Sequence, residues 1–336
     1  MRDTLQKFMF DNSLVRGELV DLSEAWRHVL SRRSYPAPVA SLLGEMMAAA
    51  ALLSANLKFN GTIILQMHGD GPVKLLVVEC DAALQLRATA KLGDDTDIAS
   101  DARLQQLVNL HGEGRFAITL DPSDKLPGQQ PYQGIVALDG DSVATVIENY
   151  MMRSEQLDTK LWLAANDSVA RGLLLQRLPE EGGTGSKSGQ TVSADDSDDG
   201  SDDDSDTWNR AVTLASTVSD EELLSTDIMT LLRRLYWEEQ VRVFEPRHPQ
   251  FRCTCTREKV GNMLKMLGRG EVDEALADLG KLEINCDFFG QDYAFDKVDC
   301  AQLFAAETLA DAVQAPRQVQ HEVEACSFAD FVSLSC

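Results

Sequence analysis

The sequence has little positive charge, few aromatic residues and no long apolar run. Its 336 residues include 31 Lys and Arg against 54 Asp and Glu, for a formal net charge of −23, and only 6% are aromatic. Such an acidic balance argues against binding nucleic acid, whose phosphates need basic contacts, and against docking on anionic lipid. The longest apolar run, Met46–Leu53, is too short to span a bilayer.

Several familiar signals are missing as well. Residues 1–10 mix charged and apolar side chains without a continuous apolar stretch, so no secretory signal is found there, and a soluble, cytoplasmic protein is expected. The motifs G-x-S-x-G and H-E-x-x-H, the P-loop and the redox pair C-x-x-C are all absent. These absences favour a protein that is not an enzyme.

Composition and periodicity divide the chain into five segments. Residues 1–178 combine helical stripes with short strand-like runs, which predicts an α+β fold whose N-terminal domain contains an antiparallel sheet. Residues 179–207 predict a disordered acidic insert, because they have few apolar side chains to bury and their charges repel. A helical linker over 208–250, a small zinc-knuckle-like, cysteine-rich domain over 251–310 and a tail over 311–336 follow.

The first segment contains eight predicted strands. They are Val15–Asp21, Thr62–Met67, Val73–Glu79, Ala83–Ala90, Arg115–Leu120, Gly134–Leu138, Lys160–Ala164 and Ala170–Leu178. The three predicted strands between residues 62 and 90 are separated by turn residues, which predicts that they form an antiparallel meander. Helices are expected after the caps Ser23 and Asp141, and a long one from Pro36 to about Leu57.

The linker carries a strong helix signal. Ser219 and Glu222 form a capping box, and four apolar residues then recur at helical spacing, which predicts a single helix. These residues are Leu224, Ile228, Leu231 and Leu235. Their stripe needs a partner surface, and either the N-terminal domain or a bound client protein would provide one.

The cysteines indicate a metal or redox site, since thiols in a cytosolic chain are mostly reduced. Cys253 and Cys255 form a C-x-C pair ahead of two short helical stripes. Cys286 opens the turn C-D-F-F-G, which has the form of a zinc knuckle with Gly290 after it. A knuckle has a second cysteine three positions after the first, but here that position holds Phe289. Three of the four expected thiols are therefore present.

The other candidate ligands have simpler interpretations. Cys300, just past the predicted return strand, is either a small core residue or a fourth ligand. His248 lies near the pair but in a loop expected to be exposed, and Cys80 at a strand end is expected to be buried and inert. Cys326 and Cys336 in the tail are expected to be exposed bystanders.

Several longer phrases resemble one known family. They are LQMHGDGPVKLLVVEC, RGLLLQRLP, LLRRLYWEEQVRVFEP, FRCTCTREKV and LEINCDFFG. Together they are similar to the heat shock protein 33 family of redox-regulated holdase chaperones, over nearly the whole chain except the acidic insert and about the last twenty residues. The resemblance implies an N-terminal α/β substrate-binding domain, a helical linker and a C-terminal zinc domain.

The resemblance also implies a mechanism and a set of partners. In the family, four cysteines bind one zinc ion when reduced; oxidation releases it, forms a disulfide within each pair, and unfolds the zinc domain and linker. The exposed apolar surface then holds unfolding client proteins without ATP, and activation is accompanied by homodimerisation. Cys253, Cys255 and Cys286 match the first three family ligands, and Phe289 departs from the fourth.

This departure leads to two hypotheses. Cys300 replaces the missing thiol, as a ligand or as the disulfide partner of Cys286, or the switch is weakened and the protein is partly active without oxidant. Two rival functional classes remain, a zinc enzyme and a zinc-stabilised module for one dedicated partner. The enzyme is disfavoured because three thiolates blunt the Lewis acidity of the metal and because no His or Glu lies beside the cysteines. The acidic insert is expected to keep chaperone–client complexes soluble.

Overall fold

A computed structural model of the chain describes residues 2–11, 13–57, 60–93, 97–125, 130–179 and 200–310, without the side chains of 200–204 and 306–310. The described residues form two compact units, which we call unit 1 and unit 2, and the boundary falls between Phe251 and Arg252. Both units mix helices with antiparallel sheet, which confirms the predicted α+β class.

The first sheet of unit 1 has five strands in the order β10-β1-β2-β9-β8, and all neighbours are antiparallel. The strands are β1 (Thr4–Phe10), β2 (Val15–Leu22), β8 (Thr159–Ala165), β9 (Ala170–Arg177) and β10 (Val241–Val243). Strand β1 is absent from the predicted set, because Gln6 and Lys7 interrupt its apolar alternation. Lys7 extends its ammonium group to the carbonyl oxygen of Ala55 at 2.6 Å, a contact that no sequence pattern shows.

The second sheet has the order β11-β5-β4-β3-β6-β7. Its strands are β3 (Gly61–His68), β4 (Val73–Asp81), β5 (Gln85–Leu92), β6 (Arg115–Pro122), β7 (Tyr132–Ala137) and β11 (Gln250–Phe251). The predicted meander β3-β4-β5 is confirmed. Strand β11 is the one parallel neighbour in this sheet, and it joins the C-terminal end of the linker to β5.

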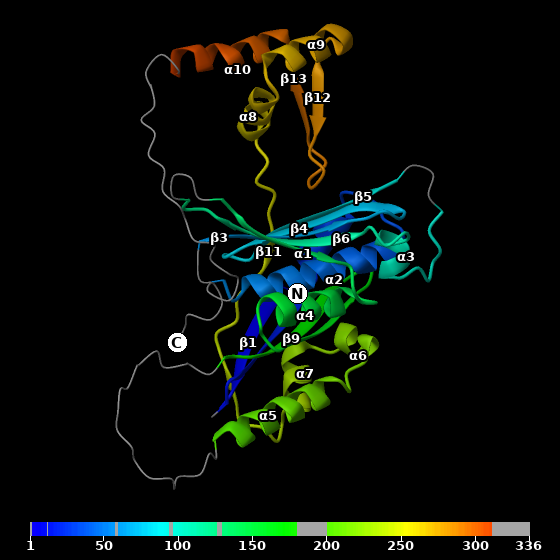
Figure 1. Cartoon of the computed structure of the whole chain (residues 1–336), viewed down its shortest axis with the longest axis vertical. Coiled ribbons are helices and arrows are strands. Elements are labelled where there is room, and N and C mark those ends of the chain that lie inside the picture. The colour runs from blue at the N-terminus through cyan, green and yellow to red at the C-terminus, as the bar shows by residue number, and fades with distance from the viewer. Residues whose placement is uncertain are drawn as a thin grey trace. The chain divides into compact units, whose positions relative to one another are not determined.

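Helix α2 (Ala37–Ser54) lies between the two sheets and contacts strands of both (Figure 1). It is long and apolar enough to cross a membrane by composition, but 78% of its residues are buried inside unit 1. A helix that is apolar on every side is typical of such a core. A Cβ at Gly44 would lie 2.4 Å from the Cβ of Ala165, so glycine lets α2 approach β8 closely.

Three further helices cover other parts of unit 1. They are α1 (Glu24–Leu30), α3 (Leu104–Val108) and α4 (Val143–Ser154). The predicted stripe of α4 is buried, from Val143 to Tyr150. Its N-cap is Ser142, which accepts a hydrogen bond from the Thr145 amide, rather than the predicted Asp141. Serine and aspartate are equally good caps, so the sequence did not decide between neighbours.

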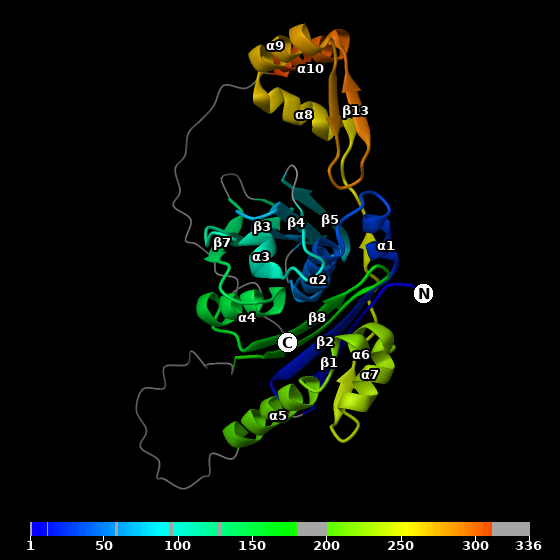
Figure 2. The same ribbon diagram turned by 90° about the vertical axis from the view of Figure 1, so that its right-hand side faces the viewer.

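The linker helices pack on the face of the first sheet that points away from α2 (Figure 2). They are α5 (Gly200–Ala215), α6 (Asp220–Ser225) and α7 (Ile228–Leu235). The prediction of one helix from Ser219 to Leu235 is wrong, because the chain turns at Thr226 and Asp227 caps a new helix through the Thr230 amide. The Ser219 cap is confirmed by its bond from the Glu222 amide.

Helix α5 begins within the predicted acidic insert. Residues 180–199 of that insert lie outside the described residues, while 200–207 belong to α5 instead of to a disordered segment. Acidic residues in the first turns of a helix interact favourably with its dipole, which explains why the helix extends into the acidic sequence. The predicted tail over 311–336 also lies outside the described residues.

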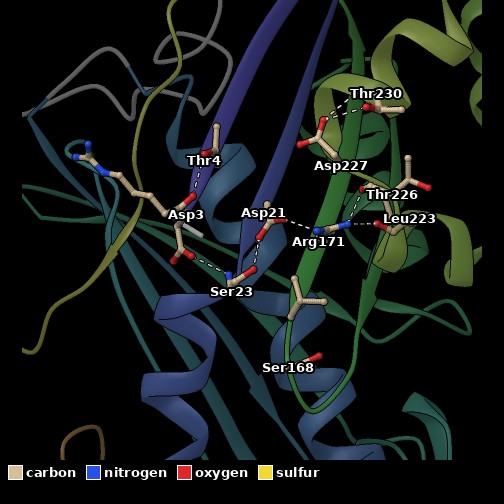
Figure 3. A network of polar contacts seen from close by, with 12 residues as sticks. Asp3, Thr4, Asp21, Ser23, Ser168, Arg171, Leu223, Thr226, Asp227 and Thr230 are labelled. Atoms are coloured by element: carbon tan, nitrogen blue, oxygen red, sulfur yellow. Dashed lines mark hydrogen bonds and ion pairs between the residues drawn. The ribbon is translucent and has the colours of Figure 1, made fainter.

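Arg171 of β9 connects the linker helices to the first sheet (Figure 3). Its guanidinium donates to the carbonyl oxygens of Leu223 at 3.1 Å and Thr226 at 2.6 Å. It also pairs with the Asp21 carboxylate of β2 at 2.6 Å, and both side chains are largely buried. One side chain therefore satisfies the carbonyls at the end of α6 and neutralises a buried acid.

Unit 2 is small and built around two hairpins. Helices α8 (Arg257–Leu267) and α9 (Arg269–Leu279) precede strands β12 (Leu282–Asn285) and β13 (Asp292–Phe295) and helix α10 (Lys297–Ala310). The predicted helix ends at Gly268 and Gly280 are confirmed, with φ of +94° and +76°. Only part of each predicted stripe is buried: Val260 and Leu264 are inside, whereas Leu279 is 70% exposed.

The N-terminus of helix α1 is capped by a side chain that is distant in the sequence. Ser23 occupies the N-cap position but makes no capping bond; instead its hydroxyl donates to Asp21 at 2.6 Å. The buried Asp3 carboxylate accepts from the amides of Ser23, Glu24 and Ala25 at 2.6–2.8 Å. Figure 3 shows the contact between Asp3 and Ser23. Burial raises the pKa of Asp3 and these amides lower it, with burial the larger effect.

We expect Asp3→Ala to lower the free energy of unfolding of unit 1 by about 2 kcal/mol, since three amides lose their acceptor. Ser23→Ala removes one hydrogen bond and should cost about 0.5–1 kcal/mol. Urea unfolding followed by tryptophan fluorescence measures both, because all four tryptophans precede residue 252 and report on unit 1. An equal or larger loss in Ser23→Ala would contradict this assignment of the cap.

Candidate metal centre

Three cysteine side chains meet in unit 2. Cys253 and Cys255 lie in the segment ahead of α8, whose first turn is capped by Thr256, and Cys286 follows β12 directly. The sulfur of Cys286 is 3.2 Å from that of Cys255 and 3.6 Å from that of Cys253. All three sulfurs lie within 4.8 Å of one another, and within the described residues this is the one group of potential metal ligands of its kind.

The turn after Cys286 has the predicted knuckle form. The Cys286 carbonyl oxygen accepts from the amides of Phe289 at 3.2 Å and Gly290 at 2.7 Å, and the Cys286 amide donates to Gln291. Gly290 has a φ of +68°, in the left-handed region that favours glycine. The hydroxyl of Tyr293 on β13 donates to the Cys255 carbonyl at 3.1 Å, which holds the C-x-C segment against the hairpin.

The donor set fits a zinc ion. Two thiolates bound to one tetrahedral zinc at about 2.3 Å lie roughly 3.8 Å apart, close to the observed sulfur separations. Burial and the two neighbouring thiols raise the pKa of Cys255 to about 12, so without a cation this thiol keeps its proton. A bound divalent cation would reverse this balance and deprotonate the sulfurs. Cys253, Cys255 and Cys286 would hold it.

The fourth position differs from a complete knuckle. Phe289 stands where the second knuckle cysteine is expected, and its side chain is partly buried. The turn keeps its backbone bonds with phenylalanine at this position. The site therefore offers three protein sulfurs on a scaffold shaped for four.

Cys300 does not join the cluster. It lies in the apolar core of unit 2, with 1% of its surface exposed, together with residues such as Leu264, Phe295 and Phe304. Burial raises the pKa of its thiol, and the nearby carboxylate of Asp299 adds to the effect. The structure thus supports the interpretation as a core residue and not the hypothesis that Cys300 replaces the missing ligand.

The remaining candidates are placed as follows. His248 belongs to unit 1, where its Nδ1 lies 2.9 Å from the Asp3 carbonyl oxygen, so it is not part of the cluster. Cys80 is fully buried in β4 as expected, and burial raises the pKa of its thiol to about 12. Cys326 and Cys336 lie outside the described residues.

The apolar stripe predicted for the linker packs against the first sheet of unit 1 in this structure. Ile228, Leu231 and Leu235 are buried in the core on the outer face of the first sheet, and Leu224 is partly buried there. Leu223 is more deeply buried than Leu224, because the break at Thr226 rotates α6 relative to the predicted continuous helix. Sequence reasoning missed Arg171 and Tyr293, whose contacts join residues far apart and leave no spacing signal.

The fold and the thiol cluster define a two-unit protein whose smaller unit carries a cysteine cluster that could hold a metal ion. The family model described as Hsp33 protein matches residues 3–296. The 33 kDa chaperonin of Chromobacterium violaceum is 48% identical over 320 residues, covering 95% of this chain and 98% of its own. That of Methylobacillus flagellatus is 44% identical and covers 91% and 95%.

A solved structure agrees with these relatives. The crystal structure of the 33 kDa chaperonin from Thermotoga maritima has a TM-score of 0.69 and 19% identity, and it covers 91% of this chain and 99% of that one. This match confirms the fold. The chain belongs to the Hsp33 family, and the predicted resemblance is confirmed. The family match includes Cys286 and Phe289 but ends before Cys300.

We expect Phe289→Cys to supply the missing thiol and to raise zinc affinity by at least about tenfold. Substitutions of residues that only hydrogen-bond to metal ligands already change metal affinity roughly 10–100-fold, and a whole ligand should matter at least as much. Competition with a chromophoric chelator measures this affinity on reduced protein. Cys300→Ser is the matched control, and its zinc affinity should equal that of the unchanged chain. Loss of zinc in Cys300→Ser would restore the hypothesis that Cys300 is a ligand.

Proposed function

We propose that this protein is a redox-regulated, ATP-independent holdase that protects unfolding and oxidatively damaged proteins from aggregation. The observation that carries the proposal is the cluster of Cys253, Cys255 and Cys286, which ties the start of unit 2 to its hairpin. Thiols this close can bind a cation when reduced and form a disulfide when oxidised. Membership of a family whose relatives are named chaperonins supports the chaperone class.

The oxidation step needs only the cluster and a peroxide. Two thiols give up two protons and two electrons to form one disulfide, and the peroxide is reduced to two molecules of water. Cys253 and Cys255 are one possible pair, and Cys286 can also pair with Cys255 or Cys253, since its sulfur lies 3.2 Å and 3.6 Å from theirs. With Phe289 in the fourth position, the cluster supports one disulfide and leaves one thiol.

Disulfide formation would remove the ligands that stabilise unit 2. Zinc bound by thiolates supplies folding free energy, on the order of 10 kcal/mol in small zinc modules. Unit 2 has a small apolar core of its own, with eight buried residues among those described. Loss of the cation should therefore unfold unit 2, which is the expected trigger of activation.

The linker connects this trigger to a client surface. Strand β11 ends at Phe251, two residues before Cys253, so the chain that leaves unit 1 enters the metal site almost directly. If the linker unfolds, the outer face of the first sheet loses α5–α7 and exposes apolar side chains such as Phe8, Leu19 and Leu173. An exposed apolar face of this kind is a site for unfolded proteins.

The partners and location follow from the same proposal. Unfolded client proteins and a second copy of the chain on activation are the proposed partners, one zinc ion per chain is the proposed cofactor, and the cytoplasm is the proposed location. The net charge of −23 favours neither nucleic acid nor an anionic membrane as a ligand. No enzymatic reaction is proposed.

A second candidate function is a holdase that is partly active without oxidant. The observation that favours it is Phe289, because a site with three sulfurs should hold zinc less tightly than one with four. A zinc-stabilised module for one dedicated partner is the third possibility, and client breadth distinguishes it, since a holdase protects unrelated proteins.

Light scattering of a thermally unfolding client tests the proposed function. The protein is compared fully reduced with zinc and after treatment with peroxide under mild heat. We expect strong suppression of scattering only after oxidation, for at least two unrelated clients. Suppression in both states would support the partly active holdase, protection of a single client would support the dedicated module, and suppression in neither state would contradict a chaperone function.

We expect Arg171→Leu to release α6 and α7 in the reduced protein. The substitution leaves the Asp21 carboxylate buried without its cation and frees the carbonyls of Leu223 and Thr226, a loss of about 3 kcal/mol for a buried pair. Increased binding of an apolar fluorescent dye by reduced protein measures this release. Arg242→Leu is the control, since its pair with Asp11 is mostly exposed. Equal dye binding by both variants would contradict the role of Arg171.

A further inference from the structure

The three-sulfur cluster of unit 2 lacks a fourth protein donor among the described residues. No further His, Cys, Asp or Glu of that part of the chain places a donor atom within 4.8 Å of all three sulfurs. Cys253 and Cys255 are partly exposed, whereas Cys286 is buried. Structural zinc sites are almost always closed by four protein ligands in a tetrahedron. A protein ligand that completes this site therefore has to come from residues outside the described ranges.

The segment over 311–336 is the natural source of such a ligand. It follows α10, which belongs to unit 2 together with the cluster. Its sequence contains two cysteines, Cys326 and Cys336, and one histidine, His321. Thiolate and imidazole are the side chains that most often complete a structural zinc site.

Chain geometry limits the distance that this segment has to cover. Asn285, next to Cys286, pairs with Asp292 at the start of β13, and α10 begins two residues after that strand. Strands rise about 3.4 Å per residue and helices about 1.5 Å, so Ala310 lies no farther than about 50 Å from Cys286. Cys326 is 16 residues beyond Ala310. Since 16 residues span up to about 55 Å, Cys326 can reach the cluster from any position that Ala310 can take.

We propose that Cys326 supplies the fourth sulfur of the zinc site in the reduced protein. The proposal rests on the zinc cofactor of the proposed function. A thiolate at the fourth position gives the four-cysteine donor set that soft ligands form around zinc.

The other two donors of the segment are less suitable. The effective concentration of a tethered ligand falls roughly as the −3/2 power of tether length, so Cys336, ten residues farther along, has about half that of Cys326. His321 is 11 residues beyond Ala310 and spans at most about 40 Å, which covers less of the possible distance.

The same thiol would complete the redox chemistry of the cluster. One disulfide among the three clustered thiols leaves one thiol, and hydrogen peroxide converts this thiol to a sulfenic acid and is reduced to one water. The thiol of Cys326 then attacks the sulfenic sulfur, and a second disulfide forms as the hydroxyl group leaves with the thiol proton as water. Cys326 would thus restore the second disulfide that Phe289 removes from the knuckle.

A thiol placed in the knuckle would compete with Cys326 for the fourth position. In Phe289→Cys protein the new ligand is three residues from Cys286, whereas Cys326 is 40 residues away. The entropic cost of closing a loop grows with its length, so the local thiol binds in preference. Cys326 should therefore matter for zinc only while position 289 holds phenylalanine.

Alkylation of reduced, full-length protein with iodoacetamide, followed by peptide mass spectrometry, tests the proposal directly. The rates are compared with zinc bound and after removal of zinc by a chelator. We expect zinc to slow alkylation of Cys326 at least about tenfold, because a metal-bound thiolate is not free to react. Cys336 is the internal control, and its rate should change less than about twofold.

Protein variants test the contribution of this thiol to affinity. Cys326→Ser should lower zinc affinity at least about tenfold in competition with a chromophoric chelator, since it removes one ligand. Cys336→Ser is the matched control and should leave the affinity unchanged. In the Phe289→Cys background, Cys326→Ser should change the affinity less than about twofold, because the two thiols serve the same position.

Several results would overturn the proposal. They are alkylation of Cys326 at equal rates with and without bound zinc, and an unchanged affinity in Cys326→Ser. Loss of affinity in His321→Asn with Cys326 unprotected would assign the fourth position to histidine instead. A zinc-dependent dimer of the reduced protein that Cys326→Ser abolishes would show that the ligand comes from a second copy.

Failure of this proposal can be told apart from failure of the proposed function. Zinc bound with Cys326 unprotected overturns the fourth ligand alone, whereas a chain that binds no zinc overturns the proposed cofactor as well. If zinc protects Cys326 but the oxidised protein suppresses no aggregation, the fourth ligand stands and the proposed holdase function fails.

Discussion

In the proposed mechanism the stability of unit 2 depends on its sulfur cluster, because the apolar core of the unit is small. Eight described residues form that core, while several members of the helical stripes stay outside, such as Met266 at 83% exposure. A module of about 60 residues buries too little surface for comfortable stability, and metals commonly supply the difference. Because the three side chains of the cluster are thiols, the proposed function makes the folding of this unit depend on the oxidation state of the cell.

In the proposed function, unit 1 has to stay folded while the helices that cover one face of its first sheet are lost. The first sheet separates two cores: Val20 and Leu22 of β2 face α2, whereas Leu19 of the same strand faces the linker helices. Alternation along a strand therefore assigns one face to the core around α2 and the other to the core under the linker helices, which the proposed function treats as a cover that can be lost. Loss of α5–α7 would leave the packing of α2 between the sheets intact. A chaperone surface can then appear without dismantling the domain that presents it.

Much of this arrangement could be predicted from local pattern, and several of the failures share one cause. The strands β2 to β9, the buried helix α2 and the ligands Cys253, Cys255 and Cys286 all follow from periodicity or spacing. Strand β1, the cap supplied by Asp3 and the contacts of Arg171 depend on residues far away in the sequence, so they leave no local signal. Cys300 shows the limit for the site, because its place in the sequence allowed both a core residue and a fourth ligand, and only the packing of unit 2 decides for the core.

The knuckle shows how the chain can lack a ligand and still keep the shape of the site. The turn is held by amides that donate to the Cys286 carbonyl, by the positive φ of Gly290 and by the pairing of β12 with β13, and none of these uses the side chain at position 289. The backbone is thus specified independently of the fourth sulfur. It follows that Phe289 acts on the free energy of metal binding rather than on the fold. In the proposed mechanism a weaker site would lower the barrier to unfolding by oxidation, so the residue at position 289 would set the sensitivity of the proposed switch.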